Sequence, residues 1–557
     1  MRLWCMKGKV TILARSIKLL WKKQGRIVLG LSMPGTFLLI ALACNLPSRQ
    51  AGGLVFPTSQ SQPTAVSLAL PTRQPTLPDA ALQIPGTLPT SQVPNPSSSP
   101  FPGLLTATPG PGQAGAWVTP VPENSLPPFT YITQPGDSLA ALASRFGVRD
   151  DEISPAQPGS GFLTAGQQLS IPNRLGEAPY PSALLPDGAV VYSPQSAGFS
   201  IEDYIAQAGG YLSTYQEQVE PGDWESGAEI VRRVALENSV NPQLLLAFLE
   251  FRSGWVRGQP VNPTQVEYPI GFYVPDNHGL AAELSMAATQ LNIGYYGWRA
   301  GTLADLIFPD YTHVRVSPAL NAGSVALQTL VSKFYRHQQD WVAALYGPKG
   351  VMAVYDEMFG DPWQAAARVG PLFPSQVGQP ILELPFAPGE LWSLTSGPHL
   401  AWKSGTPRGA LDFAPITGEP ACAVSAAWVR ASAPGMVVRS EHNAVALDLD
   451  GDGLEQTGWV LVYMHTADQD RVGVGTQVDA DAPLGHPSCE GGKATGTHVH
   501  LVRKYNGEWL AADGPLPMVL SGWVAHAREL SYDGTLEKDG QVVSAHPDGS
   551  TGSTIVR

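Results

Sequence analysis

Basic side chains are scarce in this sequence of 557 residues, where 34 Lys and Arg face 47 Asp and Glu and leave a net charge of -13. Because nucleic-acid binding needs a basic footprint, this balance argues against a nucleic-acid partner, although it says little about carbohydrate. Histidine is also scarce, with 11 in the chain. The length exceeds what one core can hold, and a prior of roughly 150 residues per domain allows three or four domains.

Long apolar runs are equally sparse, and one of them, 27–43, follows a cationic N-terminal region and ends in Ala41-Leu-Ala-Cys44. This pattern indicates an export signal over residues 1–44. It resembles a bacterial lipoprotein signal, which implies lipid attachment at Cys44. An uncleaved membrane anchor is the alternative, because the run is near the lower length limit for a span. Both interpretations place the rest of the chain outside the cytoplasmic membrane, and the leading expectation is a membrane-anchored lipoprotein at the cell envelope.

Cysteine is scarce too, with 4 residues in all. Cys5 lies in the removable segment and Cys44 is the proposed lipid site, which leaves Cys422 and Cys489 in the folded part. A disulfide between them is the simplest expectation in an oxidising compartment, and two buried free thiols are the alternative.

Residues 45–128 are rich in Pro, Ser, Thr, Gly and Gln and carry few charges. Such a composition cannot bury enough apolar surface to offset the entropy of ordering, so it predicts a disordered tether.

The stretch 129–173 predicts a small α+β module. Asp137 or Ser138 can cap a helix with apolar residues at helical spacing, and Gly147 ends it, with a short strand on each side. The stretch resembles a LysM domain of βααβ order along its whole length. That family binds N-acetylglucosamine-containing polymers such as peptidoglycan, which implies a glycan site formed by residues of two loops: Gly136, Asp137, Ser138, Leu163 and Thr164.

Residues 186–370 show a helical pattern. Ser226 and Glu229 form a capping box, Asn241-Pro242 starts a second helix, and a third is expected from Pro318 to about Tyr335. The run from Val240 to Trp255 resembles the entry helix of lytic transglycosylases and goose-type lysozymes, which implies a mainly α, lysozyme-like domain.

In that family a catalytic Glu directly precedes a Ser, but here Arg252 stands before Ser253 and the nearest acid, Glu250, lies two residues earlier. Two residues turn a helical side chain by about 200°. We therefore expect a degenerate domain, which could still bind glycan or position other parts.

After an expected linker at 371–386, residues 387–546 show short alternating strands, and 547–557 are expected to be a disordered tail. The hairpins expected are 444–449 with 459–465, and a strand ending at an Asn506-Gly507 turn. That last strand carries His498 and His500, which alternation places on one face. Chance alone gives an H-x-H pair about 0.2 times in this chain, so the accompanying residues decide its meaning.

Those residues are His399 and Asp412, the strand end at His465, and a Gly-rich segment, 485–492. Together they resemble the lysostaphin-type zinc endopeptidases, specifically the β-lytic branch. The commoner branch writes its first ligands as H-x-x-x-D, whereas here Arg408 stands four before Asp412. The β-lytic branch instead places the His well upstream, as His399 is.

The resemblance implies an all-β antiparallel metallopeptidase domain holding one zinc ion on His399, Asp412 and His500. Three protein ligands and a water make an open, catalytic site. His465 and His498 would then act on the water and the leaving group. Of the remaining histidines, His442, His486 and His526 match no ligand position of that family. Asp448-Leu-Asp-Gly-Asp452 imitates a calcium loop but lacks its final Glu.

These features favour a multidomain peptidoglycan hydrolase, a zinc endopeptidase that cuts peptide stems or cross-bridges, held to the wall by its LysM module. The β-lytic family implies cleavage next to small residues. One alternative is a non-enzymatic scaffold that activates other wall hydrolases. The other is a muramidase or lytic transglycosylase that uses Glu250.

Overall fold

The computed structural model describes residues 126–176, 179–220, 222–374 and 377–557. The expected export signal, Cys44 and most of the tether lie outside the described residues. All described residues belong to one of two contact units, Gln113–Arg557. Among the described helices, none is both long and apolar enough to cross a membrane.

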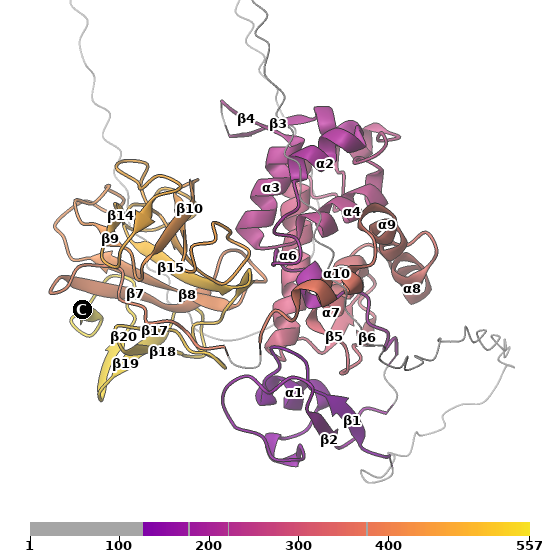
Figure 1. Ribbon diagram of the computed structural model, residues 1–557, viewed down its shortest axis with the longest axis horizontal. Helices are drawn as coiled ribbons and strands as arrows, with labels where there is room; N and C mark the ends of the chain where they lie inside the picture. Colours follow the sequence, from indigo (N-terminus) through magenta and orange to yellow (C-terminus); the bar gives the residue numbers. More distant parts are fainter. Residues whose placement is uncertain (1–125, 177–178, 221, 375–376) are drawn as a thin grey trace, which may run out of the picture. The chain divides into compact units, whose positions relative to one another are not determined.

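The first module contains one α-helix between two short strands (Figure 1). The helix begins because the Ser138 Oγ accepts a hydrogen bond from the Ala141 N–H, and it ends at Gly147, whose φ is 65°. The second helix of the expected βααβ order is a single 3-10 turn, since Pro155 follows closely and cannot continue a helix. The elements are β1 (Phe129–Ile132), α1 (Leu139–Phe146), η1 (Asp150–Glu152) and β2 (Gln168–Ile171).

The helical region follows the expected caps. The Ser226 side chain and Glu229 form a capping box at α3, and Asn241 caps α4 with Pro242 at its first position. The third expected helix, α7, is shorter than the predicted 318–335. The elements are η2 (Asp187–Ala189), α2 (Ile201–Ala208), η3 (Tyr211–Thr214), β3 (Gln216–Glu220), β4 (Asp223–Ser226), α3 (Gly227–Asn238), α4 (Pro242–Ser253), α5 (Pro263–Glu267), α6 (Leu280–Arg299), β5 (Asp305–Ile307), β6 (His313–Arg315), α7 (Ala322–Ser332), α8 (Gln338–Tyr346), α9 (Val351–Phe359) and α10 (Pro362–Val369).

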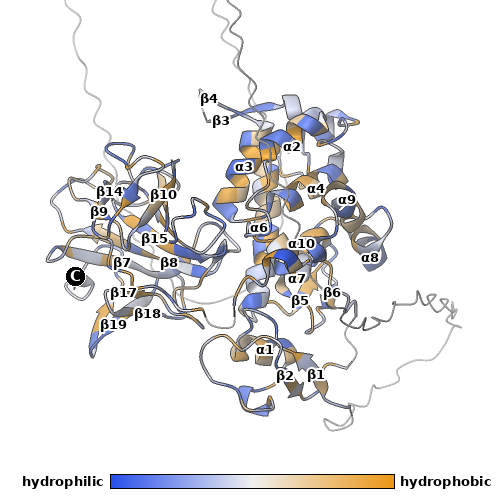
Figure 2. Cartoon of the chain, in the orientation of Figure 1, coloured by the Kyte–Doolittle hydropathy of each residue, from blue (hydrophilic) through white to orange (hydrophobic). Residues whose placement is uncertain are grey.

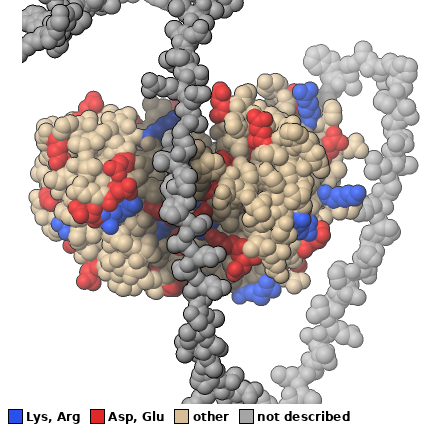
Figure 3. Space-filling model, turned by 90° about the horizontal axis from the view of Figure 1, so that it is seen from above, with Lys and Arg blue, Asp and Glu red and all other residues tan. Residues whose placement is uncertain are grey.

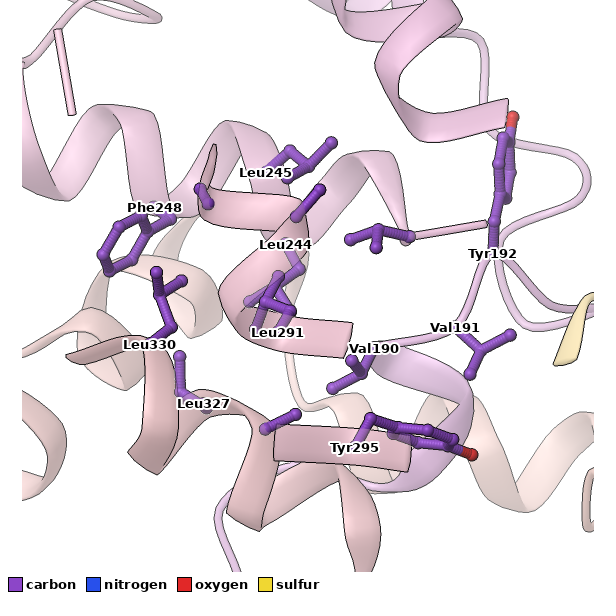
Figure 4. Close-up of a cluster of buried hydrophobic side chains, with 14 of the residues drawn as sticks. Val190, Val191, Tyr192, Leu244, Leu245, Phe248, Leu291, Tyr295, Leu327 and Leu330 are labelled. Atoms are coloured by element: carbon purple, nitrogen blue, oxygen red, sulfur yellow. The ribbon is translucent and has the colours of Figure 1, made fainter. Parts of the chain in front are cut away.

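The core of the helical region lies between α4, α6 and α7. Figure 4 shows Leu244, Leu291 and Leu327, one from each of these helices, in one cluster of buried side chains. Helix α3 is amphipathic, with hydrophilic and hydrophobic residues on different sides in Figure 2. The same cluster continues into the outer face of the following sheet, through residues such as Val460, Val502 and Trp509.

The C-terminal region is all β and antiparallel, as expected. Its main sheet has the order β13-β10-β11-β12-β15-β8-β7-β21, with β16 paired to β15, and a smaller sheet has the order β17-β18-β19-β20. The strands are β7 (Leu391–Leu400), β8 (Arg408–Pro415), β9 (Val429–Arg430), β10 (Gly435–Glu441), β11 (Ala444–Asp448), β12 (Trp459–Met464), β13 (Gln477–Val478), β14 (Pro483–Gly485), β15 (Val499–Tyr505), β16 (Glu508–Trp509), β17 (Val519–Leu520), β18 (Trp523–Ala527), β19 (Gly534–Lys538), β20 (Gln541–Ser544) and β21 (Thr554–Val556).

Both expected hairpins are confirmed. Strand β11 pairs with β12 through the loop that begins at Asp450. Strand β15 turns into β16 at Asn506 and Gly507, whose φ values are 47° and 78°. Positive φ at both central residues gives the turn type that matches the twist of paired strands.

Two expected boundaries were wrong. Within the expected linker 371–386, Leu382, Leu384 and Phe386 are buried in the core of the β region, because their alternation presents one apolar face to the sheet. Within the expected disordered tail 547–557, Thr554–Val556 forms β21 against β7, with Ile555 buried.

On the face shown in Figure 3, acidic and basic side chains are scattered among uncharged ones.

Candidate metal centre

Three neighbouring strands bring His399, Asp412 and His500 together. His500 of β15 lies directly opposite Asp412 of β8. Strand β7 is the other neighbour of β8, and its register shifts at bulges between Leu394 and Leu400. Bulges re-aim side chains, and these place the His399 ring beside the other two residues.

The donor atoms of these residues form a small triangle. His399 Nε2 lies 3.0 Å from His500 Nδ1 and 3.3 Å from Asp412 Oδ1. The third side, from His500 Nδ1 to Asp412 Oδ1, is 3.2 Å. Two donors bound tetrahedrally to zinc at about 2.1 Å each would lie about 3.4 Å apart. All three residues are buried, so the triangle has the size and shelter of one face of a tetrahedral zinc site.

Four imidazoles share one arrangement in which one nitrogen meets a backbone carbonyl oxygen. A carbonyl can only accept a hydrogen bond, so that nitrogen carries a proton, and in the neutral ring the other nitrogen presents a lone pair. The nitrogen and carbonyl pairs, with their distances, are His399 Nδ1 and Gly397 at 2.9 Å, His465 Nδ1 and Glu490 at 3.0 Å, His498 Nδ1 and Gly496 at 2.7 Å, and His500 Nε2 and Ala401 at 3.0 Å.

The direction of these lone pairs indicates whether the residues suit a metal ion. The lone pairs of His399 Nε2 and His500 Nδ1 face one another, and both face Asp412 Oδ1, a buried oxygen with no hydrogen-bond partner in the described chain. Two lone pairs and a carboxylate oxygen repel unless a cation lies between them. Ring nitrogens fixed by carbonyl acceptors are also how metal-binding histidines are oriented, so the donor set fits a metal ion.

His465 and His498 lie on the same side of the site. His465 follows β12, where Met464 lies opposite His500, and its φ of 60° marks the end of the strand. The rings of His465 and His498 have centroids 4.4 Å apart, and His498 Nε2 lies 3.8 Å from Asp412 Oδ2. The H-x-H pair therefore contributes one ring to the triangle and one beside it.

Burial and the neighbouring charges set the protonation of these groups. Burial, followed by the charge of His498, lowers the pKa of His465 to about 4, so this ring is neutral at neutral pH. Burial also lowers the pKa of His500. Burial opposes ionisation of Asp412, but the adjacent histidines outweigh it and hold its pKa well below the usual value. Burial likewise opposes charging of His399, yet Asp412 raises the pKa of that ring.

Sequence reasoning missed Tyr532, whose ring stacks on His399 with centroids 4.6 Å apart and an interplanar angle of 22°. Its side chain is 56% exposed. Tyr532 lies between β18 and β19 and belongs to no recognisable motif, so the contact exists only in the folded chain.

The expected disulfide between Cys422 and Cys489 is confirmed. It joins the segment before β9 to the segment between β14 and β15, which contacts His465 and leads into His498. The next residue, Glu490, supplies the carbonyl that holds His465, and the Thr497 hydroxyl donates to the carbonyl of Ala423 at 2.7 Å.

The other candidates have ordinary partners. The buried Asp448 carboxylate accepts the N–H groups of Asp450, Gly451 and Gly453, which makes the calcium-like segment a self-bonded hairpin tip. Burial, followed by Asp448, raises the pKa of Asp450 to about 6. His442 lies 3.9 Å from Glu225, and His486 donates from Nδ1 to the carbonyl of Ala427.

The expected glycan residues of the first module have mainly internal roles. The Asp137 carboxylate is buried, accepts from the Tyr131 hydroxyl and the Gln134 N–H, and pairs with Arg145 at 3.0 Å. Ser138 is the helix cap and Leu163 is buried, whereas Thr164 is exposed. Gly136 has a φ of 82° and packs against Arg299.

Glu250 is bound within its own helix end. Its Oε2 accepts the N–H groups of Val256 and Arg257 at 3.0 Å each, and its Oε1 lies 3.3 Å from the Arg257 guanidinium. Both oxygens of this carboxylate are engaged by Val256 and Arg257, so neither is free to meet a glycosidic oxygen.

The chain is similar to known proteins in both its helical region and its β region. Residues 183–373 match the family profile described as LasA, N-terminal domain. Protease LasA of Pseudomonas aeruginosa is 27% identical over 369 residues, which cover 61% of this chain and 78% of that protein. The beta-lytic metalloendopeptidase of Lysobacter enzymogenes is 30% identical over 160 residues, 28% of this chain and 83% of that protein. A solved structure described as the M23 metalloprotease pseudoalterin covers 30% of this chain and 96% of its own at 22% identity, with a TM-score of 0.26.

Proposed function

Because the chain belongs to the β-lytic metalloendopeptidase family, we propose that it is a zinc-dependent endopeptidase that hydrolyses peptide bonds in cell-wall peptidoglycan. The sites of cleavage would be stem peptides or cross-bridges, next to small residues. Relatives named protease and metalloendopeptidase support the reaction class.

The observation that carries the proposal is the triangle of His399, Asp412 and His500, with donor atoms 3.0 to 3.3 Å apart and two lone pairs fixed inward. When bound there, zinc would polarise the scissile carbonyl and lower the pKa of a water. Three protein donors leave room for substrate, as a catalytic site requires.

His465 and His498 would handle the protons. The His465 ring is neutral, and its Nδ1–H donates a hydrogen bond to the Glu490 carbonyl. Its other nitrogen, Nε2, can therefore accept the proton of the attacking water. His498 Nε2 lies 3.8 Å from Asp412 Oδ2, beside the proposed metal position. From this place the His498 side chain can hydrogen-bond the developing oxyanion and donate a proton to the leaving amine.

We further propose that the module 129–173 acts as a LysM-type glycan-binding unit and that residues 1–128 export, anchor and tether the enzyme at the cell envelope. The strand-helix-turn-strand order supports the module's assignment, with loops at Gly136–Ser138 and Leu163–Thr164. In the same proposal the helical domain, 186–370, retains a lysozyme-like plan without its acid, since Glu250 is held by Val256 and Arg257.

The experiment is mass spectrometry of fragments released from purified peptidoglycan, with and without a zinc chelator. Peptides cut within stems or bridges, and only without chelator, are the expected result. Glycan fragments released despite the chelator would instead move the reaction to the helical domain. No release from a protein that holds no zinc would favour the scaffold.

A further inference from the structure

A loop with no part in the ligand set lies against the candidate metal centre: Arg528–Asp533, between β18 and β19. We propose that Arg408 positions this loop, and that the loop in turn holds the ligand His399 and presents Leu530 and Tyr532 to the substrate. The part that concerns metal and substrate rests on the proposed function.

The direction of Arg408 is given by its contacts. Arg408 and Asp412 both belong to β8, but the pairing of β8 with β7 shifts register between Ala410 and Arg408, so simple alternation does not relate the two side chains. Arg408 Nη1 donates to the carbonyl oxygens of Arg528 at 2.8 Å and Glu529 at 3.3 Å. A guanidinium that donates to two carbonyls forms charge-assisted bonds, which are stronger than neutral ones. The position that would carry a ligand in an H-x-x-x-D pattern therefore serves as a loop anchor here.

The loop reaches His399 through backbone bonds. The Gly397 N–H donates to the Tyr532 carbonyl at 2.8 Å, and the Tyr532 N–H donates to the Pro398 carbonyl at 3.4 Å. The Gly397 carbonyl then accepts the Nδ1 proton of His399. The loop thus fixes the residue that orients the ligand ring, while the Tyr532 side chain stacks on that ring's face.

The contact between loop and strand allows no slack. A Cβ on Gly397 would lie 2.6 Å from the Gly534 nitrogen, and one on Gly534 would lie 2.5 Å from the His526 carbonyl oxygen. Tyr532 has a φ of 74°, which costs energy for a residue other than glycine. Such a conformation persists where its surroundings over-determine it, which is the role assigned to Arg408 and Gly397.

The loop exposes two large apolar side chains among its polar ones. Leu530 is 70% exposed and Tyr532 56% exposed. Because Tyr532 stacks directly on His399, a peptide that reaches the metal on that side would contact Tyr532, and Leu530 lies two residues away in the same exposed loop. They form a wall suited to apolar contact with the substrate chain.

The first test measures backbone exchange in the full-length protein. In Arg408→Ala, hydrogen exchange at the Gly397 and Tyr532 amides should be about tenfold faster, because two charge-assisted bonds are lost. Arg408→Lys should restore part of the protection. Arg430→Ala is the matched control, since Arg430 donates to the Asp481 carbonyl at 3.1 Å in a different sheet.

The second test measures Zn²⁺ affinity, by competition with a chromogenic chelator, and the rate of bond cleavage in purified peptidoglycan. Arg408→Ala should weaken Zn²⁺ binding about tenfold, as loss of a ligand-orienting partner does. If Arg408 acts through Tyr532, the double variant Arg408→Ala, Tyr532→Ala should lose no more activity than the worse single variant.

The possible outcomes distinguish failure of the loop inference from failure of the proposed endopeptidase function. Unchanged exchange and Zn²⁺ affinity in Arg408→Ala, or changes equal to those of Arg430→Ala, would overturn the inference, as would additive losses in the double variant. Should Arg408→Ala not fold, Arg408→Lys and Tyr532→Ala decide by the same readouts. If the wild type binds no Zn²⁺ and cleaves nothing, the proposed function fails, whereas amide exchange still judges the loop.

Discussion

At the scale of single residues, the candidate centre depends on which nitrogen of each imidazole carries the proton. The backbone carbonyls of Gly397 and Ala401 fix this for the two histidines of the triangle. Tautomer and orientation are therefore set before any ligand arrives, so little rearrangement opposes metal binding.

We predict that His500→Ala abolishes stoichiometric Zn²⁺ binding and peptidoglycan cleavage, because it removes one corner of a three-donor site. Metal content after dialysis, measured by atomic absorption, checks this. His526→Ala is the control, since His526 matches no ligand position and lies on β18. Retention of one Zn²⁺ per chain in His500→Ala would place the metal elsewhere.

We predict that Glu250→Gln leaves cleavage of peptidoglycan unchanged. Glu250 accepts two backbone N–H groups and contacts Arg257, so its role is to close the end of α4. The rate of fragment release from purified peptidoglycan is the measurement. A variant that folds but releases nothing would support the muramidase alternative.

At the scale of elements, strand β15 carries both a site histidine and a buried ion network. Lys504 of β15 and Arg439 of β10 bind Glu455, each at 2.7 Å. The two cations outweigh the effect of burial and lower the pKa of Glu455 to about 2.

We predict that this network loses its contribution in acid. The folded-state pKa lies below the ordinary glutamate value of 4.5, so the stabilisation is present above pH 4.5 and is lost as the pH falls toward 2. The shift corresponds to a free energy of unfolding on the order of 3 kcal/mol. Urea unfolding of wild type and Glu455→Gln across this range should show a stability gap that narrows as the pH falls. A constant gap would contradict the prediction.

We predict that loss of the Cys422–Cys489 bridge lowers stability. The bridge spans 67 residues, and closing a loop of that size stabilises the folded state by roughly 4 kcal/mol through the unfolded chain. Thermal unfolding with and without a reductant measures this, and a Cys422→Ala, Cys489→Ala variant should match the reduced protein. An unchanged melting temperature would contradict the prediction.

At the scale of the whole molecule, one buried cluster runs from the helices into the main sheet. It includes Leu291 of α6 and Val502 of β15, and the Tyr296 hydroxyl accepts the Trp509 N–H at 3.0 Å. Regions that share a core are expected to unfold together.

We predict that Trp509→Ala destabilises both regions at once, by about 3–5 kcal/mol, because Trp509 is fully buried in the shared cluster. Hydrogen exchange should report the same loss in α6 and β15. Trp224→Ala, at a position that is 62% exposed, is the control. Loss confined to the sheet would contradict a shared core.

Local signals in the sequence were sufficient for much of this fold. Caps at Ser138, Ser226 and Asn241 and the Asn506-Gly507 turn are short-range physics, and each appears where expected. The positions of His399, Asp412 and His500 came from a motif resemblance.

The remaining features depend on contacts between distant parts of the chain. The bulges of β7, the Tyr532 stack and the pairing of β21 with β7 each need a partner far away in sequence. No local pattern in the sequence predicts them, because the energy of strand pairing and ring stacking depends on neighbours that meet only in the folded chain. The same limit explains why 547–557 was expected to be disordered.

The alternation of β15 has a consequence for how this chain can vary. His500 and Val502 share one face while Val499 and Leu501 pack on the other. Deleting or inserting a single residue between them would exchange the two faces and turn the imidazole into the apolar core. The strand should therefore tolerate no odd-numbered change in length, so chains of this kind should differ in length at the turns rather than within β15.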